Sequence, residues 1–160
     1  MATSMAVFCV VQFMVTRLLK DNANDEQKKT FLEPLAAGRT KASFCLTEAA
    51  GGTDILRAMK TRAVKRDGMY RITGSKMWIS GATTSDFYVV LARTSEGKTE
   101  GVSMLLVPAA APGLSAREVD TFAINGYDTC QVFFDDVAVP EANLLGVEGS
   151  GFRQVLATLN

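Results

Sequence analysis

Hydrophobic and polar positions over the first twenty residues recur with a helical period. Residues from about 3 to 20 are apolar on nearly every face, and Arg17 and Lys20 lie near the end, where positive charge suits the helix dipole. A helix with so little polar surface needs neighbours on most of its sides. The pattern therefore predicts one buried helix from a larger helical domain.

A second helix is predicted to begin after Asn24. Gln27 follows three residues later, which is the spacing of a capping box. Because Pro34 cannot continue a helical ladder, we expect this helix to end at about Phe31 or Leu32.

From Lys41 the pattern changes to short runs rich in β-branched and aromatic residues. Residues 60–65 and 69–75 flank Asp67-Gly68, a tight-turn pair, and predict a hairpin. Further strands are predicted over residues 87–92, 102–107 and 129–134, and residues 152–160 begin like another helix. The fold class predicted is α+β, with a small β-barrel or sandwich in the middle of the chain.

Composition and charge exclude several classes of protein. The 160 residues are 48% hydrophobic and carry 17 basic and 17 acidic side chains, so disorder and an electrostatic surface for nucleic acid are not expected. The apolar run 6–15 is too short to span a membrane and has no basic residue before it. With no targeting segment visible, we expect a bacterial cytoplasm or a mitochondrial matrix.

The chain has no histidine, which removes Ser-His-Asp and Cys-His catalysis and most zinc sites. Cys9, Cys45 and Cys130 are odd in number, far apart and embedded in apolar runs. They are interpreted as buried thiols, and neither a metal site nor a disulfide is expected.

Two segments carry candidate chemistry. Residues 44–54 leave a strand pattern for a loop of small residues, with hydroxyls at Thr47 and Thr53, and residues 75–80 place Trp78 two positions before Ser80. Glycines let a bulky ligand approach the backbone, and an indole with hydroxyls nearby suits an aromatic cofactor. Taken singly, each feature also has an ordinary interpretation: a turn, a core tryptophan or a turn-capping hydroxyl.

These residues resemble the acyl-CoA dehydrogenase family, whose flavin site has a Thr-Glu-Pro-x-x-Gly-Ser-Asp loop and a strand ending Trp-Ile-Thr or Trp-Ile-Ser. Residues 25–38 and 134–152 are similar to the segments on either side of that family's middle domain. The resemblance implies three parts: 1–40 as the end of an N-terminal helical domain, 41–147 as a middle β-barrel domain that binds flavin and acyl-CoA, and 148–160 as the start of a C-terminal helical domain.

By this resemblance the cofactor is FAD and the reaction is α,β-dehydrogenation of an acyl-CoA thioester, with hydride passing to flavin N5. Thr47 would hydrogen-bond near N1 and O2, Ser80 near N5 and O4, Trp78 would pack against the isoalloxazine, and Thr53 would contact the CoA portion of the substrate. The implied cofactor-binding set is Phe44, Cys45, Leu46, Thr47, Gly52, Thr53, Trp78, Ile79 and Ser80.

The sequence departs from the family pattern at a few positions. Ala49 stands where proline is usual, and Gly81-Ala82 stands where Asn-Gly is frequent. Thr53 stands where the family has serine, and Ser80 stands where threonine is commoner, so both positions keep a hydroxyl. Substrate preference is left open by these changes.

The family's catalytic base is a glutamate of the C-terminal helical domain, so no catalytic residue is expected within these 160 residues. Glu48 is interpreted instead as a carboxylate that accepts local backbone hydrogen bonds. We expect the chain to be a fragment or a truncated product, and inactive alone.

The expected partners are an electron-transfer flavoprotein and further copies of the full-length protein. Relatives that use oxygen, or act on nitroalkanes or aromatic sulfur compounds, remain alternatives, as does a non-catalytic module that binds flavin or acyl-CoA or pairs with a homologue. A dinucleotide or phosphate loop is disfavoured, because the spacing of Gly146 and Gly151 fits neither motif.

Overall fold

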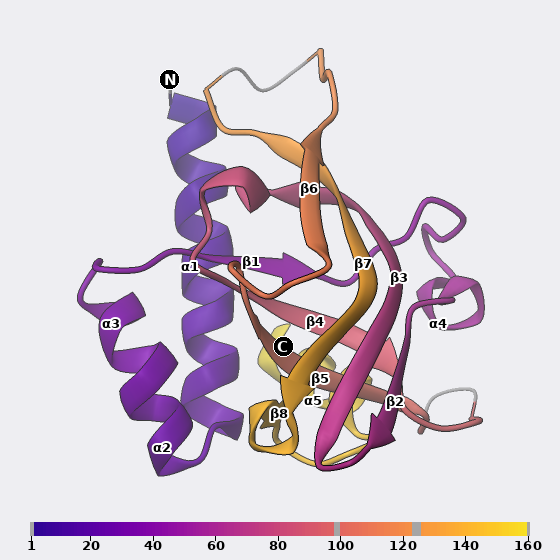
Figure 1. Cartoon of the computed structure of the whole chain (residues 1–160). Coiled ribbons are helices and arrows are strands. Elements are labelled where there is room, and N and C mark those ends of the chain that lie inside the picture. Colours follow the sequence, from indigo (N-terminus) through magenta and orange to yellow (C-terminus); the bar gives the residue numbers. More distant parts are fainter. Residues whose placement is uncertain (1, 98–99, 123–125, 160) are drawn as a thin grey trace.

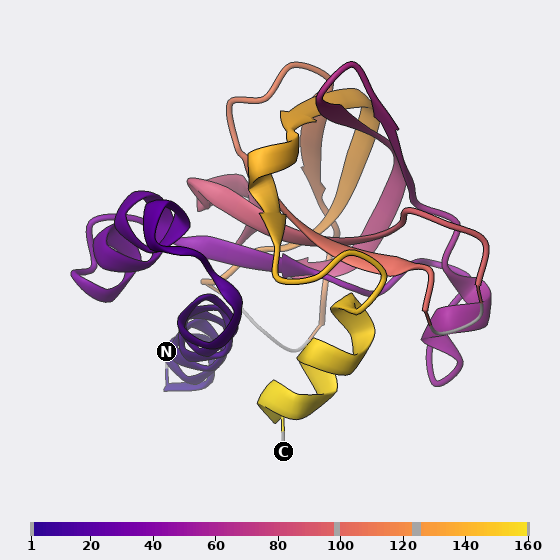
Figure 2. The same cartoon turned by 90° about the horizontal axis from the view of Figure 1, so that it is seen from below.

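The computed structural model describes residues 2–97, 100–122 and 126–159, and in these it shows one curved sheet with helices on one side (Figures 1 and 2). The N-terminal part contains α1 (Ala2–Asn22), α2 (Asp25–Gln27), a π-helical stretch (Lys28–Leu32), α3 (Glu33–Ala36), β1 (Ala42–Cys45) and α4 (Ile55–Ala58). The remaining elements are β2 (Arg62–Arg66), β3 (Met69–Ser80), β4 (Phe87–Arg93), β5 (Val102–Pro108), β6 (Leu114–Glu118), β7 (Thr129–Pro140), β8 (Leu144–Leu145) and α5 (Gly151–Leu159), with short 3₁₀ turns at Ala82–Thr84 and Glu141–Asn143.

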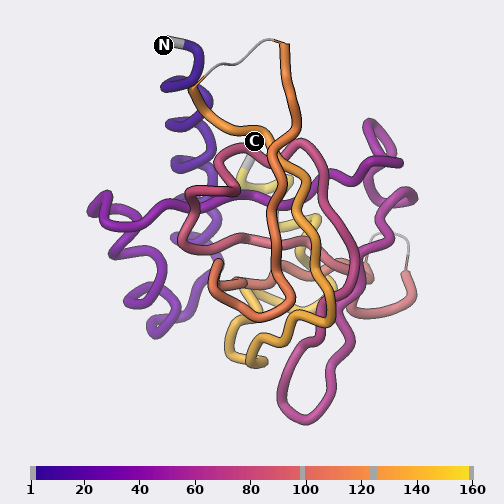
Figure 3. The backbone as a smooth tube through the Cα atoms, turned by 45° about the horizontal axis from the view of Figure 1, so that its top comes forward, coloured from indigo at the N-terminus to yellow at the C-terminus, as the bar shows by residue number. Residues whose placement is uncertain are grey.

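The eight strands follow the order β6-β7-β3-β2-β4-β5-β8, and β1 runs parallel to β4. The α+β class is confirmed, but the barrel is a loose description, because β6 and β8 do not pair within the described residues and the sheet stays open. Its two halves meet weakly: β2 and β4 share only the pair Arg62 and Arg93, whereas β3 and β7 run side by side along most of their length (Figure 3).

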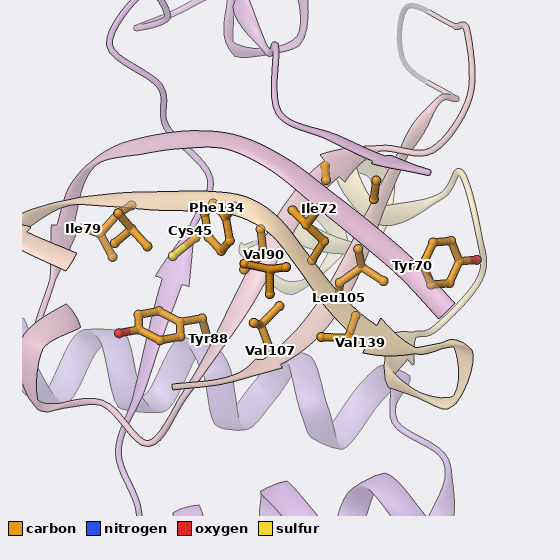
Figure 4. Packing of buried hydrophobic residues seen from close by; sticks show 14 of the residues in the cluster. Cys45, Tyr70, Ile72, Ile79, Tyr88, Val90, Leu105, Val107, Phe134 and Val139 are labelled. Atoms are coloured by element: carbon orange, nitrogen blue, oxygen red, sulfur yellow. The ribbon is translucent and has the colours of Figure 1, made fainter. Parts of the chain in front are cut away.

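Two hydrophobic clusters hold the sheet in this shape. The first lies inside the curve and includes Tyr88, Val90 and Leu105 (Figure 4). The second lies between the sheet and helices α1, α3 and α5, and includes Val89 and Leu91. Since side chains alternate across a strand, β4 contributes to both clusters and is buried on both faces.

The predicted helices are confirmed, with one correction. Asn24 and Gln27 form the expected capping box, with the Gln27 amide 2.8 Å from the Asn24 side-chain oxygen. The helix does not end before Pro34 but continues through it to Ala36. The π-helical stretch shifts the hydrogen-bond register so that Pro34 falls in the first turn of α3, where its missing N–H breaks no bond.

Helix α1 covers the sheet with one face only. Val15, Leu18 and Leu19 are fully buried, whereas Val10 and Phe13 are exposed, so the expectation of neighbours on most sides is not met within the described chain. The segment Thr3–Asn22 is long and apolar enough to cross a membrane by length and composition alone, a test that core helices and signal sequences also pass.

The predicted strands are confirmed, and the hairpin turn has the expected geometry. Asp67 and Gly68 have φ angles of 51° and 74°, as a two-residue hairpin turn with left-handed residues requires. Sequence patterns missed β6, β8 and α4, which are five residues long or shorter. They also ended β7 at residue 134, six residues before its end at Pro140.

We predict that Val90→Ala destabilises the protein by about 2 kcal/mol or more, because it removes two buried methyl groups and leaves a cavity in the inner cluster. Val64→Ala is the matched control, since Val64 is also in a strand but is 61% exposed. Urea denaturation measures both. Equal losses would contradict the assignment of the core.

Candidate functional site

The loop after β1 lies against the end of β3, which brings together the two segments singled out by the sequence. The amide of Met77 donates to the carbonyl of Thr47 at 2.8 Å. Three residues further along β3, the hydroxyl of Ser43 donates to the carbonyl of Ser80 at 2.7 Å. The site is therefore built from two stretches of chain about thirty residues apart.

Trp78 has a backbone conformation that is rare for a large side chain. Its φ is 63°, and the pairing of β3 with β7 is interrupted between Lys76 and Ile79. Left-handed backbone at a bulky residue is strained, and such strain gathers at functional sites. A bulge also redirects side chains, and the Trp78 ring is 55% exposed. The core-packing interpretation of this tryptophan is therefore wrong.

The hydroxyls of Thr47 and Ser80 are not used by the fold. Thr47 and Ser80 are half-buried, and within the described residues neither hydroxyl hydrogen-bonds to a protein atom. Ser80 does not cap the Ala82–Thr84 turn that follows it, because Gly81 is at the N-cap position of that turn and Asp128 binds the Thr83 amide. The turn-capping interpretation therefore does not hold for Thr47 or Ser80, and both hydroxyls are available to a ligand.

The outer part of the loop is open. Thr53 and Gly52 are exposed, and a Cβ added to Gly52 would meet no atom within 4 Å. The following residue, Asp54, caps α4 by accepting from the Arg57 amide. The loop thus presents backbone and a hydroxyl to solvent at this point.

The other four predicted site residues have side chains in the core. Cys45 and Ile79 belong to the inner cluster, and Phe44 and Leu46 pack against the outer one. Burial raises the pKa of the Cys45 thiol to about 12, so it is neutral and unreactive at neutral pH. Contact of these four residues with a cofactor stays a prediction, and it would involve their backbone atoms.

A buried ion pair beneath the loop was missed by the sequence analysis. Lys76 is fully buried, with Nζ 2.9 Å from Glu48 Oε1 and 3.1 Å from the carbonyl oxygen of Leu46. The sequence did contain a sign of this pair. Tyr70 and Ile72 show that the even-numbered positions of β3 face inward, and Lys76 is one of these positions. A lysine at an inward position of a strand needs a partner.

Glu48 is held by backbone donors as well as by Lys76. It accepts from the amides of Lys60 at 2.6 Å and Thr61 at 3.0 Å, so Glu48 does accept backbone hydrogen bonds, but from donors 12 and 13 residues away and not from the local ones expected. Burial alone would raise the pKa of Glu48, but Lys76 and these donors together hold it below its usual value. Burial lowers the pKa of Lys76, against the opposing effect of Glu48.

The turn after Ser80 explains the Gly81-Ala82 departure. Gly81 has a φ of 73°, and a Cβ there would lie 2.1 Å from the Tyr127 hydroxyl. The carboxylate of Asp128 accepts from the amide and the hydroxyl of Thr83 and closes the same turn. Glycine suits position 81 because of its left-handed backbone, and a larger residue there would require the Tyr127 side chain to move.

Comparison with known proteins agrees with this arrangement. Residues 43–137 match the family model described as the acyl-CoA dehydrogenase, middle domain. The chain belongs to the acyl-CoA dehydrogenase family, a family of flavoprotein oxidoreductases.

Among its relatives, the rat short/branched chain specific acyl-CoA dehydrogenase, mitochondrial, is 36% identical over 98% of this chain and 37% of its own length. The structure of butyryl-CoA dehydrogenase from Megasphaera elsdenii has a TM-score of 0.87 and 32% identity, covering 91% of this chain and 39% of the other. A structure titled electron transferring flavoprotein of Acidaminococcus fermentans has a TM-score of 0.86 and 34% identity, covering 90% and 38%. The chain thus spans well under half the length of these proteins.

We predict that Trp78→Gly is more stable than Trp78→Ala by roughly 1 kcal/mol. Both changes remove the indole, so the difference isolates the cost of a side chain at a φ of 63°. Chemical denaturation of the flavin-free protein measures it. An alanine variant as stable as the glycine variant would show that the backbone at Trp78 is not strained.

We also predict an acid-sensitive contribution from Glu48. Its pKa is lower in the folded protein than the ordinary 4.5, so the stability it contributes is complete above that value and is lost as the pH falls through the lowered pKa. The unfolding free energy of Glu48→Gln should therefore change less between pH 5 and pH 3 than that of the parent. Parallel pH profiles would rule this contribution out.

Proposed function

We propose that this chain forms the flavin- and substrate-binding part of an FAD-dependent acyl-CoA dehydrogenase, which converts an acyl-CoA thioester to its α,β-unsaturated form. One observation carries the proposal: an exposed indole on strained backbone lies in the strand against which the Thr47 loop is bonded, and the hydroxyls of Thr47 and Ser80 bond to nothing in the described chain. The match of residues 43–137 to the family's middle domain supports it.

The residues present fit a flavin. Trp78 offers a flat face, and Thr47 and Ser80 offer hydroxyl donors on either side of it in the sequence. FAD, when bound, supplies the hydride acceptor of the reaction. We assign Thr47 to the N1 and O2 edge, where negative charge develops on reduction, so its hydroxyl favours the reduced cofactor. Ser80 is assigned to the N5 and O4 edge, and Trp78 to the ring face.

The loop is assigned to the substrate as well. Thr53 lies exposed at the outer end of the loop, and we assign it to the CoA portion of the substrate. We propose residues 41–147 as the domain that binds both ligands, with 1–40 and 148–160 belonging to flanking helical domains.

The base that removes the α-proton is proposed to lie outside these 160 residues. Glu48 is the carboxylate of the loop, and its oxygens are occupied by Lys76 and by two backbone amides. Electrons would leave through an electron-transfer flavoprotein. That step and assembly into a homo-oligomer are proposed by analogy with the family.

The test uses a protein carrying this chain at the full length of its relatives. We expect it to copurify with FAD and to reduce a dye acceptor with an acyl-CoA. Trp78→Ala should weaken FAD binding roughly fivefold, since stacking contributes on the order of 1 kcal/mol beyond burial. Flavin fluorescence measures the dissociation constant.

Val64→Ala is the control, because Val64 is exposed on β2 and pairs with Arg71 in the middle of the β2–β3 hairpin, seven residues before Trp78 along β3. Equal FAD affinity of Trp78→Ala and the parent would refute the role of the indole. Flavin binding without turnover of any acyl-CoA would favour the non-catalytic module.

A further inference from the structure

We propose that Lys76 is a positioning residue of the flavin site, and that it sets the reduction potential of the bound cofactor by holding the Thr47 hydroxyl in place. The proposal rests on the assignment of Thr47 to the flavin N1 and O2 edge made above. Lys76 itself is fully buried, so we place its action on the Thr47 hydroxyl and not on the cofactor.

Lys76 holds the loop on both sides of Thr47. One N–H of its ammonium group donates to the carbonyl of Leu46, the preceding residue, and another to the carboxylate of Glu48, the following one. Bonds to a charged donor are shorter and stronger than bonds between neutral groups. Thr47 therefore cannot shift along β3 without breaking one of them.

The next residue of β3 adds a third restraint. The amide of Met77 donates to the carbonyl of Thr47 itself. Consecutive residues thus have separate tasks: Lys76 and Met77 fix the loop, and Trp78 turns its ring outward from the bulge. Three consecutive residues of β3, 76–78, therefore set where the Thr47 hydroxyl lies relative to the indole of Trp78.

Glu48 connects this clamp to a third part of the fold. Its carboxylate also accepts from the amides of Lys60 and Thr61, at the entrance to β2. The loop is therefore bonded both to β3 and to the residues that lead into β2.

Stability alone does not account for this ion pair. Removing two charges from water is unfavourable, and well-packed apolar residues often stabilise a protein equally well. The pair instead fixes the position of the loop, because each hydrogen bond has a required geometry. That property matters where a hydroxyl must meet a developing charge, and loosely held donors lose most of their effect there.

The experiment compares Thr47→Ala, Lys76→Met and the double variant in the full-length flavin-loaded protein, by the two-electron midpoint potential of the bound FAD. Thr47→Ala should weaken binding of the reduced relative to the oxidised cofactor about tenfold, which lowers the potential by about 30 mV. Lys76→Met should lower it in the same direction by at least half as much.

The double variant separates positioning from a merely structural role. If Lys76 acts through Thr47, adding Lys76→Met to Thr47→Ala should change the potential by less than a third of its effect alone. Additive shifts, or an unchanged potential in Lys76→Met, would overturn the inference and leave the assigned role of Thr47 intact. An unchanged potential in Thr47→Ala would instead overturn that assignment in the proposed function.

Two further variants keep the test decisive. Arg71→Met is the matched control, because Arg71 is a cation of the same strand paired with the Asp136 carboxylate at the surface, and it should leave the potential unchanged. Glu48→Gln breaks the clamp from the opposite side and replaces Lys76→Met if that variant does not fold. Glu48→Gln should also lower the midpoint potential, and its effect should not add to that of Thr47→Ala. Additive shifts of the potential would count against the inference in the same way.

Discussion

The site depends on the attachment of one loop to one strand. Thr47 and Glu48 leave the sheet after β1, and their bonds to Met77 and Lys76 hold the loop against the strand that carries the exposed indole. The ammonium group of Lys76 matters most to this attachment. Both its acceptors, the Leu46 carbonyl and the Glu48 carboxylate, belong to the loop, and water cannot replace either of them at a fully buried position. Disturbing this attachment would separate the hydroxyl from the ring while leaving most of the hydrophobic core unchanged.

The helices contribute to the site by fixing where β1 lies. On one side β1 pairs with β4. On the other, the side-chain amide of Gln12 in α1 donates to the carbonyl of Ala42 and accepts from its amide, both at 2.9 Å. Gln12 thus takes the place of a neighbouring strand and satisfies an otherwise open edge. Through this contact α1, with its apolar face on the sheet, sets the point from which the loop departs.

Exceptions to local rules gather at the end of β3. A tryptophan has a left-handed backbone, a lysine is buried, and Gly81 has a left-handed backbone with the Tyr127 hydroxyl where a Cβ would lie. Elsewhere in the described chain, β7 has an irregularity at Asp136, with a φ of 52° beside a second register shift against β3, but aspartate adopts this conformation far more readily than tryptophan. The apolar residues of the strands fill two clusters. Natural sequences break several local rules together mainly where function requires it, and this concentration distinguishes the site from the rest of the sheet.

The sequence by itself determined the longer helices, most of the strands and the two motifs, because helical period, β-branched runs and the Asp67-Gly68 pair act over a few residues. It also identified the residues that resemble a flavin site. Tertiary structure alone decided that Trp78 points outward, since the bulge arises from pairing with β7, and that Lys76 holds Glu48, since their contact joins positions 28 residues apart. The open sheet and the helix that continues through Pro34 were also decided at this level, because strand closure and helix register depend on packing partners that local patterns do not contain.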